Sequence, residues 1–370
     1  MQKSTALLKK MGKWLLGLLG VLVVLVAGYV IYMQLQYFRI DDHQAIATEN
    51  NPSDTIQLNH AYTATTYNIG FGAYSPSYSF FMDSGESLTG EKSHGKYSRA
   101  YSKKETEKNT SGSIQTIKQI NPDFAFFQEV DEKATRSYGV NQLERIKQGM
   151  NQYGSAYAKD FHTAYLFYPL TEPHGAVQGG IVTMTKHHVQ SNDRRQFPVS
   201  NGFLDKFFDL DRCFLVSRLP VSNGKELVMI NLHMSAYDKG GKSRAAQLKL
   251  LNQVMSEEAN KGNYVIAGGD FNHALGDSVH QFPTEQKTPD WVYELKDSDL
   301  ADGFHFVKAA NATSVPTCRE TDTAYQPGFS YTVVVDGFLV SDNVKATAEN
   351  QDRQFSYSDH NPVKLTFTLQ

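Results

Sequence analysis

The stretch that decides the fold of this chain is Tyr264-Val265-Ile266-Ala267-Gly268-Gly269-Asp270-Phe271-Asn272. Its apolar, β-prone start and the glycines that follow are typical of a buried strand that ends in a turn. Asp270 and Asn272 lie two residues apart, so their side chains leave the same face of an extended segment. Taken alone, the segment also fits an ordinary turn rich in aspartate and asparagine.

Five other strand-like runs along the chain also deliver polar side chains at or just after their ends. Proteins with mixed helices and sheets bind ligands in such crevices, so these ends predict a shared site. The polar residues in question are Asn68, Glu129, His233, Asp336 and the adjacent pair Asp359 and His360.

These residue types suit metal-assisted hydrolysis of a phosphoester. Glu129 and the aspartates offer the hard oxygen ligands that Mg²⁺ prefers, and a bound metal would neutralise phosphate charge. Histidines or neutral amides could stabilise the transition state, and Asp336 is the candidate to orient His360. Each residue also has an ordinary interpretation: His233 as a core histidine, Asp336 as a turn residue before Gly337.

The remaining chain alternates short apolar runs with helical stretches, which predicts an α/β or α+β domain with helices covering sheets. The segment 71–108 is polar, aromatic and long enough to suggest a functional loop. Helices are expected over 113–120, 141–153 and 243–259. Strands are expected over 61–69, 123–128, 180–184, 213–216, 226–232, 263–267, 329–340 and 363–369.

The N-terminus has a different character. Residues 14–33 are almost uninterruptedly apolar, and a helix of this length nearly crosses a hydrocarbon core of about 30 Å. Four lysines precede it in residues 1–13, while Asp41 and Asp42 follow. This charge bias predicts a cytoplasmic basic tail, a single membrane anchor and an extracytoplasmic remainder. A cleaved signal peptide is the alternative. Residues 34–55 are polar and suggest a linker, and residues 56–370 a single domain.

Composition restricts the partners. The formal net charge is −3, and the first 33 residues carry four of the 36 basic residues and none of the 39 acidic ones. The domain is therefore acidic and lacks the basic field of a typical nucleic-acid binder. The two cysteines, Cys213 and Cys318, are too few for a disulfide framework or a thiolate metal cage.

The ordered set of motifs resembles the endonuclease/exonuclease/phosphatase superfamily, which includes deoxyribonuclease I, abasic-site endonucleases, inositol polyphosphate 5-phosphatases and neutral sphingomyelinases. The resemblance covers about residues 62–370. It implies a four-layer α/β/β/α sandwich of two mixed sheets. The motifs are Asn68, Gln128-Glu129, Asn231-Leu232-His233, Gly269-Asp270-Phe271-Asn272, Val335-Asp336-Gly337-Phe338 and Ser358-Asp359-His360-Asn361-Pro362-Val363.

The same resemblance implies roles for these residues. Glu129 would be the main Mg²⁺ ligand (Mn²⁺ being the other candidate), with Asn68 beside it and Asp359 either binding metal or positioning His360. Asp270 would orient or deprotonate the attacking water. The residues implied to act on the scissile phosphate are His233, Asn272 and His360, the last held by Asp336.

The sequence thus predicts a membrane-anchored, extracytoplasmic, metal-dependent phosphoesterase. A lipid headgroup or small phosphorylated substrate is favoured, because the domain would lie near headgroups. One alternative is an extracellular nuclease that acts on DNA or RNA. Another, from a different class, is a catalytically silent binding protein on the same fold. No obligate protein partner is implied.

Overall fold

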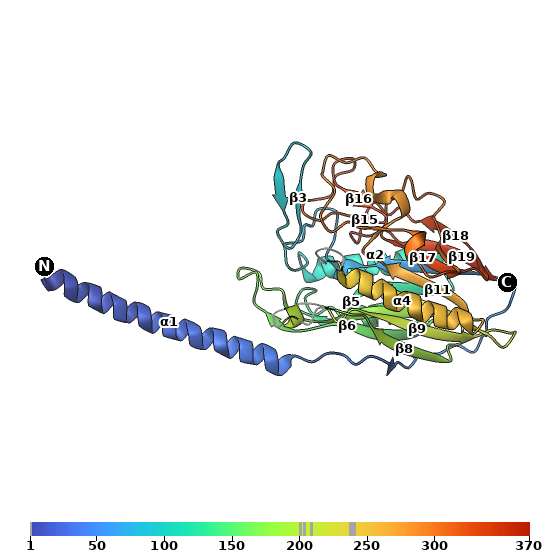
Figure 1. Cartoon of the computed structure of the whole chain (residues 1–370), viewed down its shortest axis with the longest axis horizontal. Coiled ribbons are helices and arrows are strands. Elements are labelled where there is room, and N and C mark those ends of the chain that lie inside the picture. The colour runs from blue at the N-terminus through green and yellow to red at the C-terminus, as the bar shows by residue number, and fades with distance from the viewer. Residues whose placement is uncertain (1, 200–201, 203–204, 208–209, 237–241) are drawn as a thin grey trace.

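Two mixed β-sheets packed face to face form the centre of the domain (Figure 1). The computed structural model describes the chain except for Met1 and residues 200–201, 203–204, 208–209 and 237–241. The seven-stranded sheet runs, in spatial order, through β1 (Gln44–Ala45), β8 (Ser191–Gln196), β9 (Cys213–Pro220), β10 (Glu226–His233), β11 (Tyr264–Asp270), β17 (Asp336–Ser341) and β14 (Phe304–Phe306). The six-stranded sheet runs through β18 (Val344–Asn350), β19 (Val363–Leu369), β2 (Ala61–Asn68), β5 (Phe124–Ala134), β7 (Gly175–Thr185) and β6 (Gly154–Leu166).

The main core lies between the two sheets. Phe126 of β5 and Phe338 of β17 are fully buried there, with their ring centroids 6.3 Å apart. Burial of each such side chain contributes roughly 1.5–3 kcal/mol. A polar bond also crosses this interface, because Gln128 Nε2 donates to Asn231 Oδ1 at 2.8 Å. Gln128 directly precedes Glu129, and Asn231 lies two residues before His233. The bond therefore fixes the relative position of two candidate site segments.

Helices cover the outer faces of both sheets. Helices α2 (Lys103–Ile120) and α3 (Gln142–Gly149) pack on the six-stranded sheet through a cluster that includes Ile117 and Ile146. Helix α4 (Lys242–Asn260) packs on the seven-stranded sheet through a cluster that includes Leu251. The order helix, sheet, sheet, helix confirms the predicted four-layer sandwich.

Several predicted elements have different bounds: α3 is shorter than the predicted helix 141–153, and β5, β7 and β9 are longer than the predicted strands. Two further differences have a clear cause. Helix α2 begins at Lys103 instead of residue 113, because Ser102 caps it by accepting from the Glu105 amide and its buried face is polar at Thr106 and Asn109. The strand predicted over 329–340 divides into two elements, β16 (Thr332–Val333) and β17 (Asp336–Ser341). The short elements outside the main sheets are β3 (Ser84–Glu86), β4 (Lys92–His94), β12 (Ala274–Leu275), β13 (Glu294–Leu295), β15 (Cys318–Arg319), β16 (Thr332–Val333) and 3-10 turns at Gly70–Gly72, Asp205–Phe207, Gly276–His280 and Asp297–Asp299.

Helix α1 (Gln2–Gln36) extends away from the domain (Figure 1). Its part from Lys9 to Gln36 is long and apolar enough to cross a membrane, and its most apolar stretch is not buried inside the structure. A signal sequence would show the same properties. The segment predicted as a linker packs along the domain: β1 pairs with β8, and Ile40 is buried.

Candidate active site

The candidate site forms where strands of the two sheets end side by side. Parallel pairing of β10 with β11 sets His233 opposite Asp270, and antiparallel pairing of β11 with β17 sets Asp270 opposite Asp336. Asp336 therefore opens β17 and does not end a strand, contrary to the sequence interpretation. Because β17 runs antiparallel to β11, its first residue reaches the same edge of the sheet as the last residue of β11.

Glu129 lies within β5, where the sequence predicts a strand end. The register of β5 against β7 shifts between Phe127 and Val130, and Glu129 has a φ of 54°, in the left-handed region. Such a bulge re-aims a side chain at the cost of local strain. The Glu129 carboxylate is thereby turned toward β2, where its Oε1 accepts from Asn68 Nδ2 at 3.0 Å.

Asn68 and Asp270 form the centre of the cluster. Asn68 Nδ2 also donates to Asp270 Oδ2 at 3.0 Å, so one amide holds two carboxylates together. The Asn68 orientation is fixed by the Gly70 amide, which donates to its Oδ1 at 3.0 Å. Burial raises the pKa of Asp270, but the nearby His360 and His233 outweigh burial and lower it, so this carboxylate is ionised.

Two histidines lie close to the same oxygen of Asp270. His360 Nε2 lies 3.8 Å and His233 Nε2 3.5 Å from Asp270 Oδ2. His360 Nδ1 is bonded to Asp336 Oδ2 at 2.8 Å, as the sequence predicts. Although burial lowers it, the charge of Asp336 raises the pKa of His360 well above its usual range, so the ring carries a proton on both nitrogens.

The sequence interpretation missed Asp160, the carboxylate behind His233. Asp160 is buried in β6, and its Oδ2 lies 3.7 Å from His233 Nδ1. Among the described residues, neither atom has a hydrogen-bond partner. Strand β6 was not predicted, so nothing marked Asp160 as an inward-facing acid; the alternation Ala156, Ala158, Asp160 is the signal that could have found it.

The last two predicted residues lie beside this cluster. Asn272 donates its backbone N–H to Asp270 Oδ1 at 2.8 Å, while its side-chain amide donates to the Met234 carbonyl at 2.8 Å. A methyl group added at Gly70 would sit 2.9 Å from Asp359 Oδ1, which places that carboxylate against the Asn68 segment. The structure thus brings all eight predicted residues into one region.

The donor set fits a divalent cation. The pKa of Asp359 is raised to about 7, mainly by burial. The nearby His360 lowers this pKa, and the negative charge of Glu129 raises it further, because the two carboxylates lie close together. Asp270, Asp336 and His360 also place one ligand atom each within 4.8 Å of one another. A protonated His360 cannot bind metal, so the carboxylates of Glu129 and Asp359 remain the candidate ligands beside Asn68.

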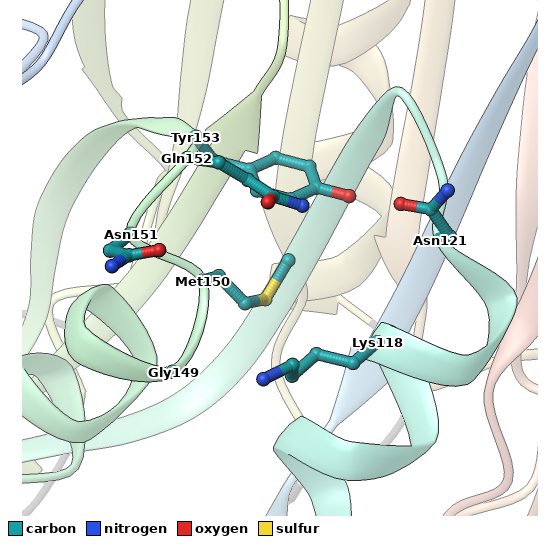
Figure 2. A pocket seen from close by; sticks show the side chains of 7 residues that line it. All are labelled: Lys118, Asn121, Gly149, Met150, Asn151, Gln152 and Tyr153. Carbon is teal, nitrogen blue, oxygen red and sulfur yellow. The ribbon is translucent and has the colours of Figure 1, made fainter.

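A separate hollow of about 90 Å³ lies between the C-terminal ends of α2 and α3 (Figure 2). It is lined by neutral amides and one lysine, and none of the predicted site residues lines it. It contains no carboxylate and no histidine, the groups on which the predicted site depends. Its lining residues are Lys118, Asn121, Gly149, Met150, Asn151, Gln152 and Tyr153.

Comparisons with known proteins place the chain in a family. The sequence model of the Endonuclease/Exonuclease/phosphatase family matches residues 65–360. A UPF0294 protein from Vibrio campbellii is 28% identical over 160 residues, which cover 43% of this chain and 46% of that relative. The match thus spans less than half of the relative's length.

Solved structures share the fold at low identity. TDP2 from C. elegans superposes with a TM-score of 0.53 at 15% identity, covering 86% of this chain and 77% of its own. An endonuclease/exonuclease/phosphatase from Beutenbergia cavernae gives 0.54 at 14% identity (84% and 72%). ANGEL2, a 2′,3′-cyclic phosphatase, gives 0.53 at 16% identity (89% and 99%). With the family match covering most of the domain, the chain belongs to the endonuclease/exonuclease/phosphatase family, whose members are divalent-metal-dependent phosphoester hydrolases.

Proposed function

We propose that this chain is a membrane-anchored, Mg²⁺-dependent phosphoesterase whose domain, residues 56–370, lies outside the cytoplasm. The favoured substrate is a lipid headgroup phosphoester or a small phosphorylated molecule. The observation that carries the proposal is the contact of one ionised carboxylate, Asp270, with Asn68 and with two histidines. A binding protein has no need of this combination of acid, base and metal ligands.

Each residue has a distinct role in the proposed reaction. Glu129, Asn68 and Asp359 would hold the cation, which when bound neutralises phosphate charge and supports the leaving oxygen. Asp270 would orient the attacking water and accept its proton. His360, protonated and fixed by Asp336, would donate to a phosphate oxygen. His233 and Asn272 would contact the same phosphate from the other side.

A substrate panel tests this proposal. The purified full chain is assayed with Mg²⁺, with Mn²⁺ and with a chelator on bis-p-nitrophenyl phosphate, sphingomyelin, inositol phosphates and plasmid DNA. We expect metal-dependent turnover that Asp270→Asn abolishes and that Asp302→Asn, at an exposed position remote in sequence from the cluster, retains. No turnover on any substrate, or equal turnover by Asp270→Asn, would contradict the enzyme proposal.

A nuclease is the second candidate. It is favoured by one structural relative, TDP2 from D. rerio, whose structure contains a single-strand DNA product. The acidic composition of the domain argues against it, since nucleic-acid affinity depends on basic contacts with phosphates. Preferential nicking of plasmid DNA in the same panel would reverse the order of the two candidates.

The proposed orientation has its own test. A membrane-impermeant protease added to intact cells should digest the domain, because the lysines before residue 14 favour a cytoplasmic N-terminus. Protection of the domain would contradict the orientation. A mature N-terminus that starts beyond Tyr32 would show that the helix is a cleaved signal.

A further inference from the structure

The loop between β6 and β7 exposes large apolar side chains in an unusual concentration. Within residues 167–174, here called the interfacial loop, Phe167 is 51%, Tyr168 69% and Leu170 84% exposed. A soluble surface tolerates single exposed apolar residues, but a contiguous group indicates an interaction site. Figure 1 shows this green loop projecting from the domain on the side from which α1 extends.

The C-terminal end of α1 is packed directly against the strand that leads into this loop. Tyr29 Oη donates to the Tyr165 carbonyl at 3.1 Å, and the Tyr165 amide donates to Tyr32 Oη at 3.2 Å. The rings of Tyr29 and Phe167 meet edge to face at 5.4 Å between centroids. The loop therefore starts at the height of Tyr29 and Tyr32 on the helix.

The position of Tyr29 and Tyr32 along α1 defines a depth in the membrane if α1 crosses a bilayer. This inference rests on that part of the proposed function. Tyr29 and Tyr32 lie inside the apolar segment 14–33, within about 6 Å of its end at 1.5 Å per residue. Tyrosines at such positions mark the membrane interface. Side chains that pack against them and point outward must lie at the depth of the lipid headgroups.

The loop is also joined to the candidate active site. The ring of Tyr168 lies 5.8 Å from that of Phe81, and Phe81 lies 5.0 Å from Phe80. Phe80 packs in the buried aromatic cluster with Phe71, which follows Asn68 by three residues. Ring contacts thus run from Tyr168 of the loop to the segment that carries Asn68, and Phe167, the residue before Tyr168, contacts the helix.

A basic group accompanies the aromatic residues. Arg99 Nη2 lies 3.4 Å from Tyr165 Oη, and its Nε donates to the Pro173 carbonyl. This guanidinium is half-buried at the base of the interfacial loop, where it suits the phosphate of a lipid headgroup. Aromatic and leucine side chains with a nearby cation are the composition of segments that lie in a membrane interface.

We propose that the interfacial loop inserts Phe167, Tyr168 and Leu170 into the outer leaflet beside α1. The occupant of this surface is the lipid bilayer itself. The insertion holds the Asn68 edge of the domain against the leaflet, so that substrates reach the site from the headgroup layer.

Depth-dependent fluorescence quenching tests the insertion. Leu170→Cys is labelled with a polarity-sensitive fluorophore, and the full chain is placed in nanodiscs of phosphatidylcholine and phosphatidylglycerol. Labelling is specific because both native cysteines are buried free thiols. The matched control is Leu88→Cys, at a residue that is 58% exposed between β3 and β4 and carries no contact with α1 that the structure records.

We expect a blue-shifted emission at position 170 that doxyl-labelled lipids quench severalfold, and neither change at position 88. An incorporated chain without quenching at 170, or with equal quenching at both positions, would overturn the insertion while leaving the phosphoesterase proposal intact. A chain that fails to enter the nanodisc overturns the insertion together with the proposed anchor. Failure of the substrate panel affects only the enzymatic proposal, because quenching does not depend on turnover.

Discussion

The two histidines that face Asp270 are held in different ways. His360 is tied to Asp336 by a bond of 2.8 Å, whereas His233 and Asp160 stand 3.7 Å apart with both facing atoms unbonded. The first pair fixes the tautomer and the direction of its ring. The second leaves buried polar atoms unsatisfied, at a cost of about 1–3 kcal/mol for each such group.

This difference indicates which half of the site is ready before a substrate binds. The His360 side is already organised to present a charged donor. The His233 side is open in the way that catalytic contacts often are without substrate, and it is expected to tighten around a bound phosphate. The two histidine–carboxylate pairs therefore predict that the same Asp→Asn substitution will lower activity by different amounts in each pair.

The largest effect is expected at Asp270, the residue that the two histidines share. Asp270→Asn removes the negative charge that both rings face and the proton acceptor for water, so kcat should fall by roughly 10³–10⁴-fold. Turnover of bis-p-nitrophenyl phosphate measures it, with Asp302→Asn as the control. A loss of less than about tenfold would mean that another residue handles the water.

The comparison itself is tested by Asp336→Asn against Asp160→Asn. We expect kcat to fall about 100-fold for Asp336→Asn and about tenfold for Asp160→Asn, with KM almost unchanged in the first, because only Asp336 holds its histidine by a formed bond. Separate measurement of kcat and KM distinguishes lost orientation from lost binding. Equal losses, or the reverse order, would break the distinction between the two pairs.

A substitution at Glu129 tests whether the metal ligands act separately from both histidine–carboxylate pairs. Glu129→Gln should raise the Mg²⁺ concentration needed for half-maximal activity by about tenfold, because it removes a charged ligand. Magnesium titration of activity measures this shift. The control is Glu132→Gln, a nearby acid that pairs with Lys159 at 3.4 Å. An unchanged magnesium requirement in Glu129→Gln would remove Glu129 from the metal site.

The smallest effect on kcat is expected at an ion pair far from the site. Its loss shows how the removal of an ion pair changes stability alone. Arg218 contacts Glu258 at 2.6 and 2.7 Å, so Glu258→Gln should lower the free energy of unfolding by about 1–3 kcal/mol without changing kcat. Urea unfolding and turnover of the same sample measure both quantities. A similar loss of kcat in this variant would mean that the effects at the two histidine pairs report stability.

The pH dependence of that stability follows from Glu258. Although burial raises it, hydrogen bonds from Arg218, Lys261 and Asn263 lower the pKa of Glu258 to about 2, from an ordinary value of 4.5. A depressed pKa stabilises the fold above the ordinary value and loses that contribution as pH falls toward 2. The stability difference between wild type and Glu258→Gln should therefore shrink between pH 5 and pH 2, as acid unfolding would show.

Apolar periodicity predicted many of the helices and strands, because it reports burial directly, whereas the four-layer order was implied by the family resemblance. Strand β11 and helix α4 lie where periodicity placed them. The prediction failed where polar residues are buried: the first half of α2 hides Thr106 and Asn109, and β6 mixes small, polar and aromatic residues. Periodicity cannot distinguish such faces from solvent-exposed ones.

The sequence predicted those residues of the candidate site that belong to motifs at strand ends. Asp160 lies in no such motif and approaches His233 only through the pairing of β6 with β7 and the packing of the two sheets. The bulge at Glu129 was equally hidden, since its register depends on the partner strand. Both features arise from contacts between distant segments.

The segment between α1 and the domain is docked along the edge of the seven-stranded sheet. This docking limits how far the domain can move from α1. A flexible linker of the same length as residues 34–55 would allow the domain to move about 25 Å from the end of α1. The pairing of β1 with β8 and the burial of Ile40 remove most of that freedom. With α1 as an anchor, the domain would work at one fixed height, on molecules of its own membrane, and would not reach across to an opposing one.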